Sequence, residues 1–265
     1  MFKRNLLYGL LVGLFVISTA FSQKETKTVS KTIKPYSGKS FSLKNAFGDV
    51  IVTGTDKNEV SIVAKISSEI IDAKKIVNDI DIRIDESSSS IDVETIIPEY
   101  LKNNKIKNGS DIKSFYKDKE MYRIDYVISV PKSVYLTIDN SFGKTNIKDI
   151  SNKVDVKNTF GELNIKNCTS SNQIKSEFGS IVLKNIGGGS DITNNFGEVK
   201  IDVVSGDISI SSEFGDFKVN DVTGSVKVKT SFSNVSLENI KGDVEVKEDG
   251  FSNISTKKIG GTIRE

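Results

Sequence analysis

Phenylalanine returns at a fixed interval through the C-terminal half of the chain, and this repeat limits the possible folds more than any other feature. Six phenylalanines follow one another at intervals of 18 residues, and a seventh comes after 19. Self-similarity at a fixed period is the signature of a repeat architecture. We expect these side chains to form a structural ladder, one ring per repeat: Phe142, Phe160, Phe178, Phe196, Phe214, Phe232 and Phe251.

Each repeat contains two short segments in which apolar and polar residues alternate. Ile208/Ile210 and Val226/Val228 are examples of these pairs. Such alternation favours strands with one buried face over helices. Gly, Asn and Asp recur between the segments, where bends need left-handed backbone. Because a full period restores every column in the same order, each repeat predicts one coil of a parallel β-solenoid rather than a hairpin.

One isolated repeat occurs much earlier. "NAFGDVIV" begins at Asn45, and we expect Val60 and Ile62 to supply the return strand of this first coil. Residues 69–80 place apolar side chains near helical spacing, which predicts one short helix. The alternation on either side of Ser87–Ser90 predicts a hairpin.

These patterns divide the chain into three parts, and the fold class follows from them. We expect an all-β chain, a single-stranded right-handed parallel β-helix of 18-residue coils, with an N-terminal mixed β cap that carries the short helix. The predicted parts are a signal peptide at 1–22, an N-terminal β region at 23–139 with its first coil near 45–65 and its cap at 66–139, and the regular solenoid at 140–265.

The first residues fit a secretory signal peptide. Lys3 and Arg4 precede an apolar run from Leu6 to Phe21, and Ser22 and Gln23 flank a cleavage position of the usual small-residue kind. The run is shorter than the roughly 20 residues that span a bilayer. We therefore expect export, with no membrane span after cleavage and a final location in the periplasm, on the cell surface or outside the cell.

The composition excludes several kinds of chemistry. The chain contains no histidine, which removes Ser-His-Asp and Cys-His catalysis and histidine-ligated zinc. Cys168 is the only cysteine, so no intramolecular disulfide can form, and its apolar column predicts a buried, inert thiol. Removing Lys3 and Arg4 leaves 35 basic against 35 acidic residues, which disfavours a nucleic-acid partner. We expect no cofactor and no catalytic or metal-binding residue.

The "FGDVIV" start, the "VISVP" segment and the stacked units that begin with Phe-Gly resemble a known family. This is the DUF4097-type family of exported bacterial putative adhesins, found in bacteria of the Bacteroidetes type. The resemblance covers roughly residues 30–265 and implies a right-handed parallel β-helix in the cell envelope. It supplies no catalytic residues.

The Phe-Gly corner supports two interpretations. The phenylalanines could pack inward as a core ladder or point outward as a strip that grips sugar rings; we expect them in the core, with glycine easing the bend. Ser233 and Ser252 replace glycine in the last units, and we expect Asn234 and Asn253 to take the left-handed angle there. Two charged sets, which we expect to be solvated, could bind calcium or acidic polysaccharide: Glu162, Glu177, Glu198, Glu213 and Asp216, and Lys148, Lys166 and Lys184.

The leading functional hypothesis is a non-enzymatic envelope or surface protein that acts as a binding, adhesion or structural module. The alternatives are a carbohydrate-active β-helix enzyme (a polysaccharide lyase or hydrolase) and a partner in envelope-stress signalling. Coils of 18 residues leave little loop for a catalytic cleft, which argues against the enzyme. The expected partners are a protein or glycan of the envelope, or a second copy that pairs with the C-terminal edge.

Overall fold

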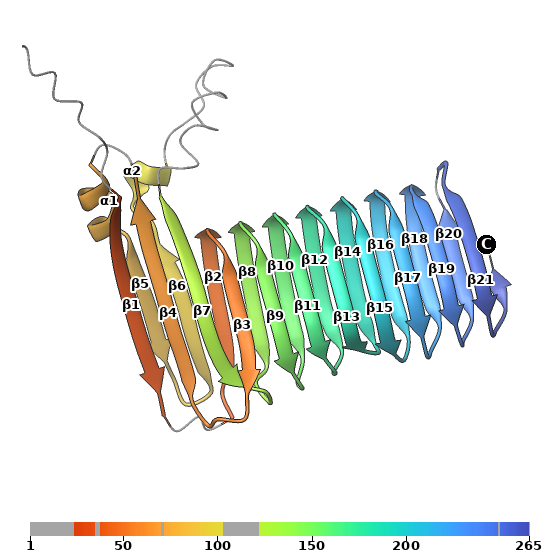
Figure 1. Cartoon of the computed structure of the whole chain (residues 1–265), viewed down its shortest axis with the longest axis horizontal. Coiled ribbons are helices and arrows are strands. Elements are labelled where there is room, and N and C mark those ends of the chain that lie inside the picture. Colours follow the sequence, from red (N-terminus) through yellow and green to blue (C-terminus); the bar gives the residue numbers. More distant parts are fainter. Residues whose placement is uncertain (1–23, 35–37, 70–71, 103–121, 249, 265) are drawn as a thin grey trace, which may run out of the picture.

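A computed structural model describes residues 24–34, 38–69, 72–102, 122–248 and 250–264. The predicted signal peptide lies outside these residues. The described chain is almost entirely β and winds into a solenoid with a mixed-sheet region at its N-terminal end, as Figure 1 shows. The predicted fold class is therefore confirmed.

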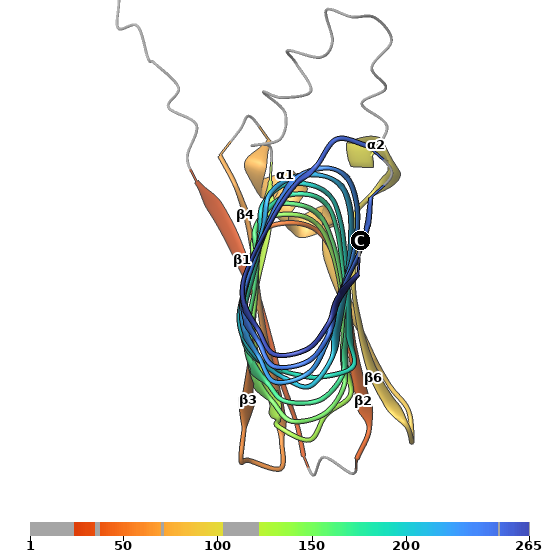
Figure 2. The ribbon, with the colours of Figure 1, turned by 90° about the vertical axis from the view of Figure 1, so that its right-hand side faces the viewer.

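Two sheets of eleven strands form the walls of a flattened tube, which Figure 2 shows almost along the tube axis. In spatial order the first sheet contains β1 (Glu25–Ile33), β4 (Val60–Ser68), β7 (Arg123–Pro131), β3 (Val50–Thr55), β9 (Thr145–Ile150), β11 (Leu163–Cys168), β13 (Ile181–Gly187), β15 (Val199–Ser205), β17 (Phe217–Val222), β19 (Asn234–Ile240) and β21 (Asn253–Ile259). The second sheet contains β22 (Ile263–Arg264), β20 (Val244–Glu248), β18 (Val226–Phe232), β16 (Ile208–Phe214), β14 (Ser190–Phe196), β12 (Asn172–Phe178), β10 (Val154–Phe160), β8 (Leu136–Phe142), β2 (Ser40–Phe47), β6 (Ser90–Ile96) and β5 (Asp81–Glu86).

Equivalent residues of neighbouring coils pair in parallel, so each sequence column becomes a row of contacts. Ile174 pairs with Ile192 in the second sheet, and Ile165 pairs with Leu183 in the first. Their side chains lie between the two sheets and are almost fully buried. This aliphatic interior contributes most of the stabilisation, at about 1.5–3 kcal/mol for each fully buried side chain.

The last column of each first-sheet strand is displaced by one left-handed residue. Asn167 and Asn185 have φ values of 55° and 54°, and the register skips them, so Cys168 pairs with Ile186. This bulge turns the third apolar residue back to the interior, three positions after the second. The predicted Asn/Asp turn column is therefore confirmed, although Val203 occupies it once, at φ 64°.

The N-terminal region differs from the expected first coil. Val60 and Ile62 do not return to the second sheet; they lie on β4, which pairs antiparallel with β1 and β7 in the first sheet. β7 lies between β4 and β3, so a strand from far along the sequence completes the stack. The expectation is wrong because alternation fixes which face of a strand is buried but not its neighbour.

The predicted helix and hairpin are confirmed. α1 (Ala73–Asp79) packs on β1 and β4 through Ala73, Ile76 and Val77. β5 and β6 pair antiparallel on either side of the serine-rich turn. A second helix, α2 (Glu99–Lys102), was not predicted. No helix in the described ranges is long and apolar enough to cross a membrane.

Candidate functional site: the phenylalanine edge

The phenylalanine column lies on the outside of the solenoid, so the prediction of an inward column is wrong. We call Phe47, Phe142, Phe160, Phe178, Phe196, Phe214 and Phe232 the phenylalanine edge. Its last five rings are 37–47% exposed, whereas the aliphatic columns beside them are at most a few per cent exposed. The edge follows the corner at which each second-sheet strand ends and the chain crosses to the first sheet.

A polar residue two positions before each phenylalanine takes the inner side of that corner. These residues are buried: Asn45, Asn140, Asn158, Ser176, Asn194, Ser212 and Thr230. The amide of Asn158 donates to the Gly161 carbonyl at 2.9 Å, and Asn194 makes the same bond to Gly197. The corner carbonyls are thus satisfied from inside, which leaves the ring to turn outward.

This inner polar column was missed by the sequence analysis. The signal was present in the repeated tripeptides "NAF", "NSF", "NTF", "SEF" and "NNF", where the first residue is always Asn, Ser or Thr through Thr230. Near the N-terminal end the column is linked by hydrogen bonds, from Asn45 to Asn140 at 3.1 Å and from Thr145 to Asn158 at 3.0 Å.

Glycine is required at the corner because neighbouring coils approach closely there. Gly197 has φ 134°, and a Cβ atom on it would lie 2.2 Å from the Gly179 carbonyl oxygen. Ser233 replaces this glycine in a corner of different geometry, where its hydroxyl accepts a bond from Thr230 at 2.7 Å. Among the described residues neither Asn234 nor Asn253 has a positive φ, so the predicted exchange of the left-handed angle is wrong.

The rings of the edge stack face to face. Successive centroids are 4.9–5.3 Å apart with interplanar angles of 2–7°, so six steps of about 5 Å give a straight edge about 30 Å long. Each ring face is covered by its neighbour, and the ring edges point to solvent. Phe251 departs from the stack, with its centroid 6.5 Å from that of Phe232 and its plane tilted by 40°.

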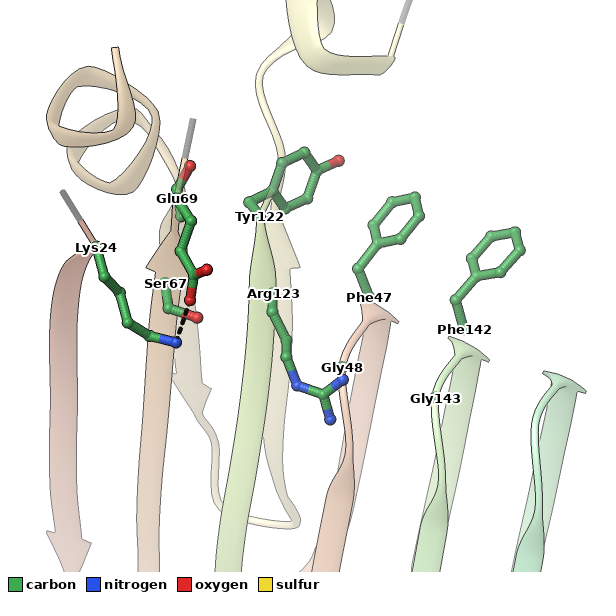
Figure 3. Close-up of a pocket in the computed structure, with 10 residues that line it drawn as sticks. Lys24, Phe47, Gly48, Ser67, Glu69, Tyr122, Arg123, Phe142 and Gly143 are labelled. Carbon is green, nitrogen blue, oxygen red and sulfur yellow. Dashed lines mark hydrogen bonds and ion pairs between the residues drawn. The ribbon is translucent and has the colours of Figure 1, made fainter. Parts of the chain in front are cut away.

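A pocket of about 460 Å³ lies at the N-terminal end of the edge, between the phenylalanine rings and the last turns of β4 and β7. Figure 3 shows Tyr122, Phe47 and Phe142 projecting side by side from their strands. Tyr122 meets Phe47 edge to face, with centroids 5.2 Å apart and planes at 79°. Tyr122 therefore covers the outer face of the first ring, and its burial raises the pKa of its hydroxyl to about 12.

The charged groups around this pocket are paired. Lys24 forms an ion pair with Glu69, drawn as a dashed line in Figure 3. Arg123 lies 2.6 Å from Asp49 and 2.8 Å from Asp125, and these acids hold the pKa of its guanidinium above the usual value. The pairing leaves the aromatic rings as the distinctive chemical feature of this end.

The acids near the Phe-Gly corner do not come together as a metal site. Glu162 lies 2.8 Å from Lys144, Glu177 lies 3.7 Å from Lys157, and Glu198 lies 2.8 Å from Lys200. Two other acids of the predicted set complete the corner: Asp216 accepts a bond from Asn234 at 2.8 Å, and Glu213 lies beside the Phe214 ring in sequence. No group of three potential ligands is present in the described part of the chain.

The only cysteine is buried as predicted. Cys168 lies in the aliphatic interior, and this burial raises the pKa of its thiol to about 11. A thiol with so high a pKa carries almost no thiolate near neutral pH, so it reacts slowly.

Comparison with known proteins gives similarity at the level of structure alone. No family model matches the chain, and no curated protein matches it. A solved structure described as a putative cell adhesion protein from Clostridium sporogenes has 14% identity and a TM-score of 0.33, covering 91% of this chain and 100% of that one.

Two further solved structures come from Bacteroidetes. A putative adhesin from Bacteroides fragilis has 14% identity and a TM-score of 0.33, covering 90% of this chain and 96% of that one. A putative lipid binding protein from Parabacteroides distasonis has 11% identity and a TM-score of 0.44, covering 90% and 97%. The chain is thus similar to solved proteins that carry adhesin-like names.

Proposed function

We propose that this chain is an exported, non-enzymatic member of the DUF4097-type family that acts as a binding or adhesion module in the cell envelope or on the cell surface. Its contact surface is the phenylalanine edge. The observation that carries the proposal is a straight row of partly exposed rings on a solenoid whose interior is otherwise filled by aliphatic side chains. Large exposed apolar strips on soluble proteins mark interaction sites.

The stacking of the rings favours a protein partner. Sugars bind aromatic residues through the ring faces, and between Phe47 and Phe232 each face lies against the next ring. What remains exposed is a narrow hydrocarbon strip, which suits an apolar groove on a protein partner. The strip sits on rigid strands, so binding costs little ordering of the backbone.

The acids beside the edge are poorly placed for hydrolase or lyase chemistry. Lys144 lies beside Glu162 and lowers the pKa of its carboxyl. A general acid needs its pKa raised toward the working pH, so this ion pair acts in the opposite direction. This supports a binding role over the carbohydrate-active alternative.

Sedimentation of the purified protein with envelopes isolated from the producing bacterium tests the proposal. We expect wild type to co-sediment and the Phe178→Ser/Phe196→Ser variant to bind at least tenfold more weakly, because its contact strip is interrupted. Treating the envelopes with protease beforehand should abolish binding of the wild type.

Circular dichroism establishes that the variant is folded, and Thr193→Ala/Ser211→Ala, on the outward face of the same strands, serves as the matched control. Equal binding by wild type and the phenylalanine variant would refute the phenylalanine edge as the contact surface. Binding that survives the protease would refute the protein partner.

A further inference from the structure

A second surface of the solenoid concentrates positive charge in register. On the outward face of the first sheet, five consecutive strands each present one exposed lysine. We call this set the lysine row: Lys148, Lys166 and Lys184 on β9, β11 and β13, and Lys200 and Lys218 on β15 and β17. The first three are paired directly across the strands, and so are the last two.

The two halves of the row are offset by two residues. Lys200 pairs with Val182, two positions before Lys184, and Asp202 occupies the position beside Lys184. Residues two apart in a strand face the same side, so the row continues on one face of the sheet. The sequence column alone ends at Asp202, which is why sequence reasoning read it as interrupted.

The row lacks matching negative charge at one end. Lys184 lies 3.4 Å from Asp202, and Lys200 lies 2.8 Å from Glu198. Within the described residues, Lys148 and Lys166 form no ion pair, although they are neighbours across β9 and β11. Like charges directly opposite each other in a sheet are destabilising, so this end gains from an external counter-charge.

The geometry defines the kind of counter-charge. Neighbouring strands are about 4.8 Å apart, so four steps place the five ammonium groups along about 19 Å of a flat wall. Asn146 and Asn164 flank this end and are joined by an amide hydrogen bond of 3.0 Å. The surface therefore offers regularly spaced cations and amide groups, and it suits a linear anion with one charge per repeating unit.

We propose that the lysine row binds an acidic polysaccharide that lies along the solenoid axis, with one carboxylate or sulfate near each lysine. Duplex DNA fits less well, since it carries one charge per about 1.7 Å of axis and is read by elements that enter its grooves. The proposal adds a ligand class to the proposed adhesion function and uses residues outside the phenylalanine edge. Its failure would leave the edge untouched.

The test measures binding of polygalacturonate to the purified protein by calorimetry at low salt, with neutral dextran and duplex DNA as comparison polymers. We expect saturable binding of polygalacturonate that weakens as salt rises, and none of dextran. Lys148→Ser/Lys166→Ser should raise the Kd at least tenfold. A charge-matched control, Lys229→Ser/Lys247→Ser, removes two lysines that are also neighbours in register, on the opposite sheet, and should change the Kd less than twofold.

Three results would overturn the proposal. They are no saturable binding of polygalacturonate at low salt, an equal loss in both double variants, and tighter binding of duplex DNA with the same dependence on Lys148 and Lys166. Unchanged circular dichroism and melting temperature of both variants establish that any difference reflects the surface rather than the fold.

Discussion

The two sides of the Phe-Gly corner reverse the usual distribution of side chains. Inside it, Asn, Ser and Thr are buried, and outside it a row of phenylalanines is exposed. One position away along the same strands, aliphatic columns fill the interior as expected. The difference teaches that a turn is governed by its backbone hydrogen bonds: the corner carbonyls need donors more than the corner needs an apolar ring.

The sharpest test of this comparison contrasts an inner and an outer residue of β14. Ile192→Ala removes a fully buried side chain and should lower the free energy of unfolding by about 2–5 kcal/mol. Phe196→Ala removes a ring that is 41% exposed and should cost only about 1–2 kcal/mol despite its larger size. Urea unfolding followed by circular dichroism measures both, and equal losses would place the ring in the core.

Gly197→Ala probes the backbone at the same corner. The new Cβ atom would meet the Gly179 carbonyl at 2.2 Å in a backbone conformation that disfavours side chains, so we expect a loss of about 2–4 kcal/mol. Gly38→Ala is the control, because that glycine also has a positive φ but no atom within 4 Å of the new Cβ. If both variants melt together, close packing of the coils does not explain the glycine.

Asn158→Ala tests the inner polar column. It leaves the Gly161 carbonyl without its side-chain donor and removes the acceptor of the Thr145 hydroxyl, which should cost about 1–3 kcal/mol. Asn164→Ala, on the outer face of β11, removes surface hydrogen bonds and should cost well under 1 kcal/mol. Equal melting temperatures for the two variants would mean that the inner column is dispensable.

The smallest effect has the opposite sign. Val203 is the one β-branched residue in the left-handed column that Asn and Asp otherwise fill, at φ 64°. Val203→Asn relieves that strain and places an amide between Asn185 and Asp221, so we expect stabilisation of about 1 kcal/mol. Val182→Asn, an outward substitution on regular backbone, is the control, and the same gain there would rule out relief of strain.

Much of the fold could be predicted from local pattern. The 18-residue period, the alternation and the Asn/Asp column were sufficient for the solenoid, because in-register stacking repeats one local solution in every coil. The helix at Ala73–Asp79 and the β5–β6 hairpin followed from spacing for the same reason. Stacking also made the phenylalanines a ladder, as Phe160 and Phe178 show.

Three features required the tertiary structure. The outward direction of Phe160 depends on Asn158 filling the corner, and alternation cannot report that competition. The position of β7 between β3 and β4 depends on strand pairing across more than fifty residues. The continuation of the lysine row from Lys184 to Lys200 depends on which outward positions share one face.

The sequence by itself thus determined the repeating unit, its strands and the residues that line its interior, since these follow from short-range periodicity. The tertiary structure alone decided which side of the corner each conspicuous side chain occupies and which surfaces become continuous. The physical reason is that hydrogen bonding at a turn and pairing between distant strands are satisfied only when the coils are assembled.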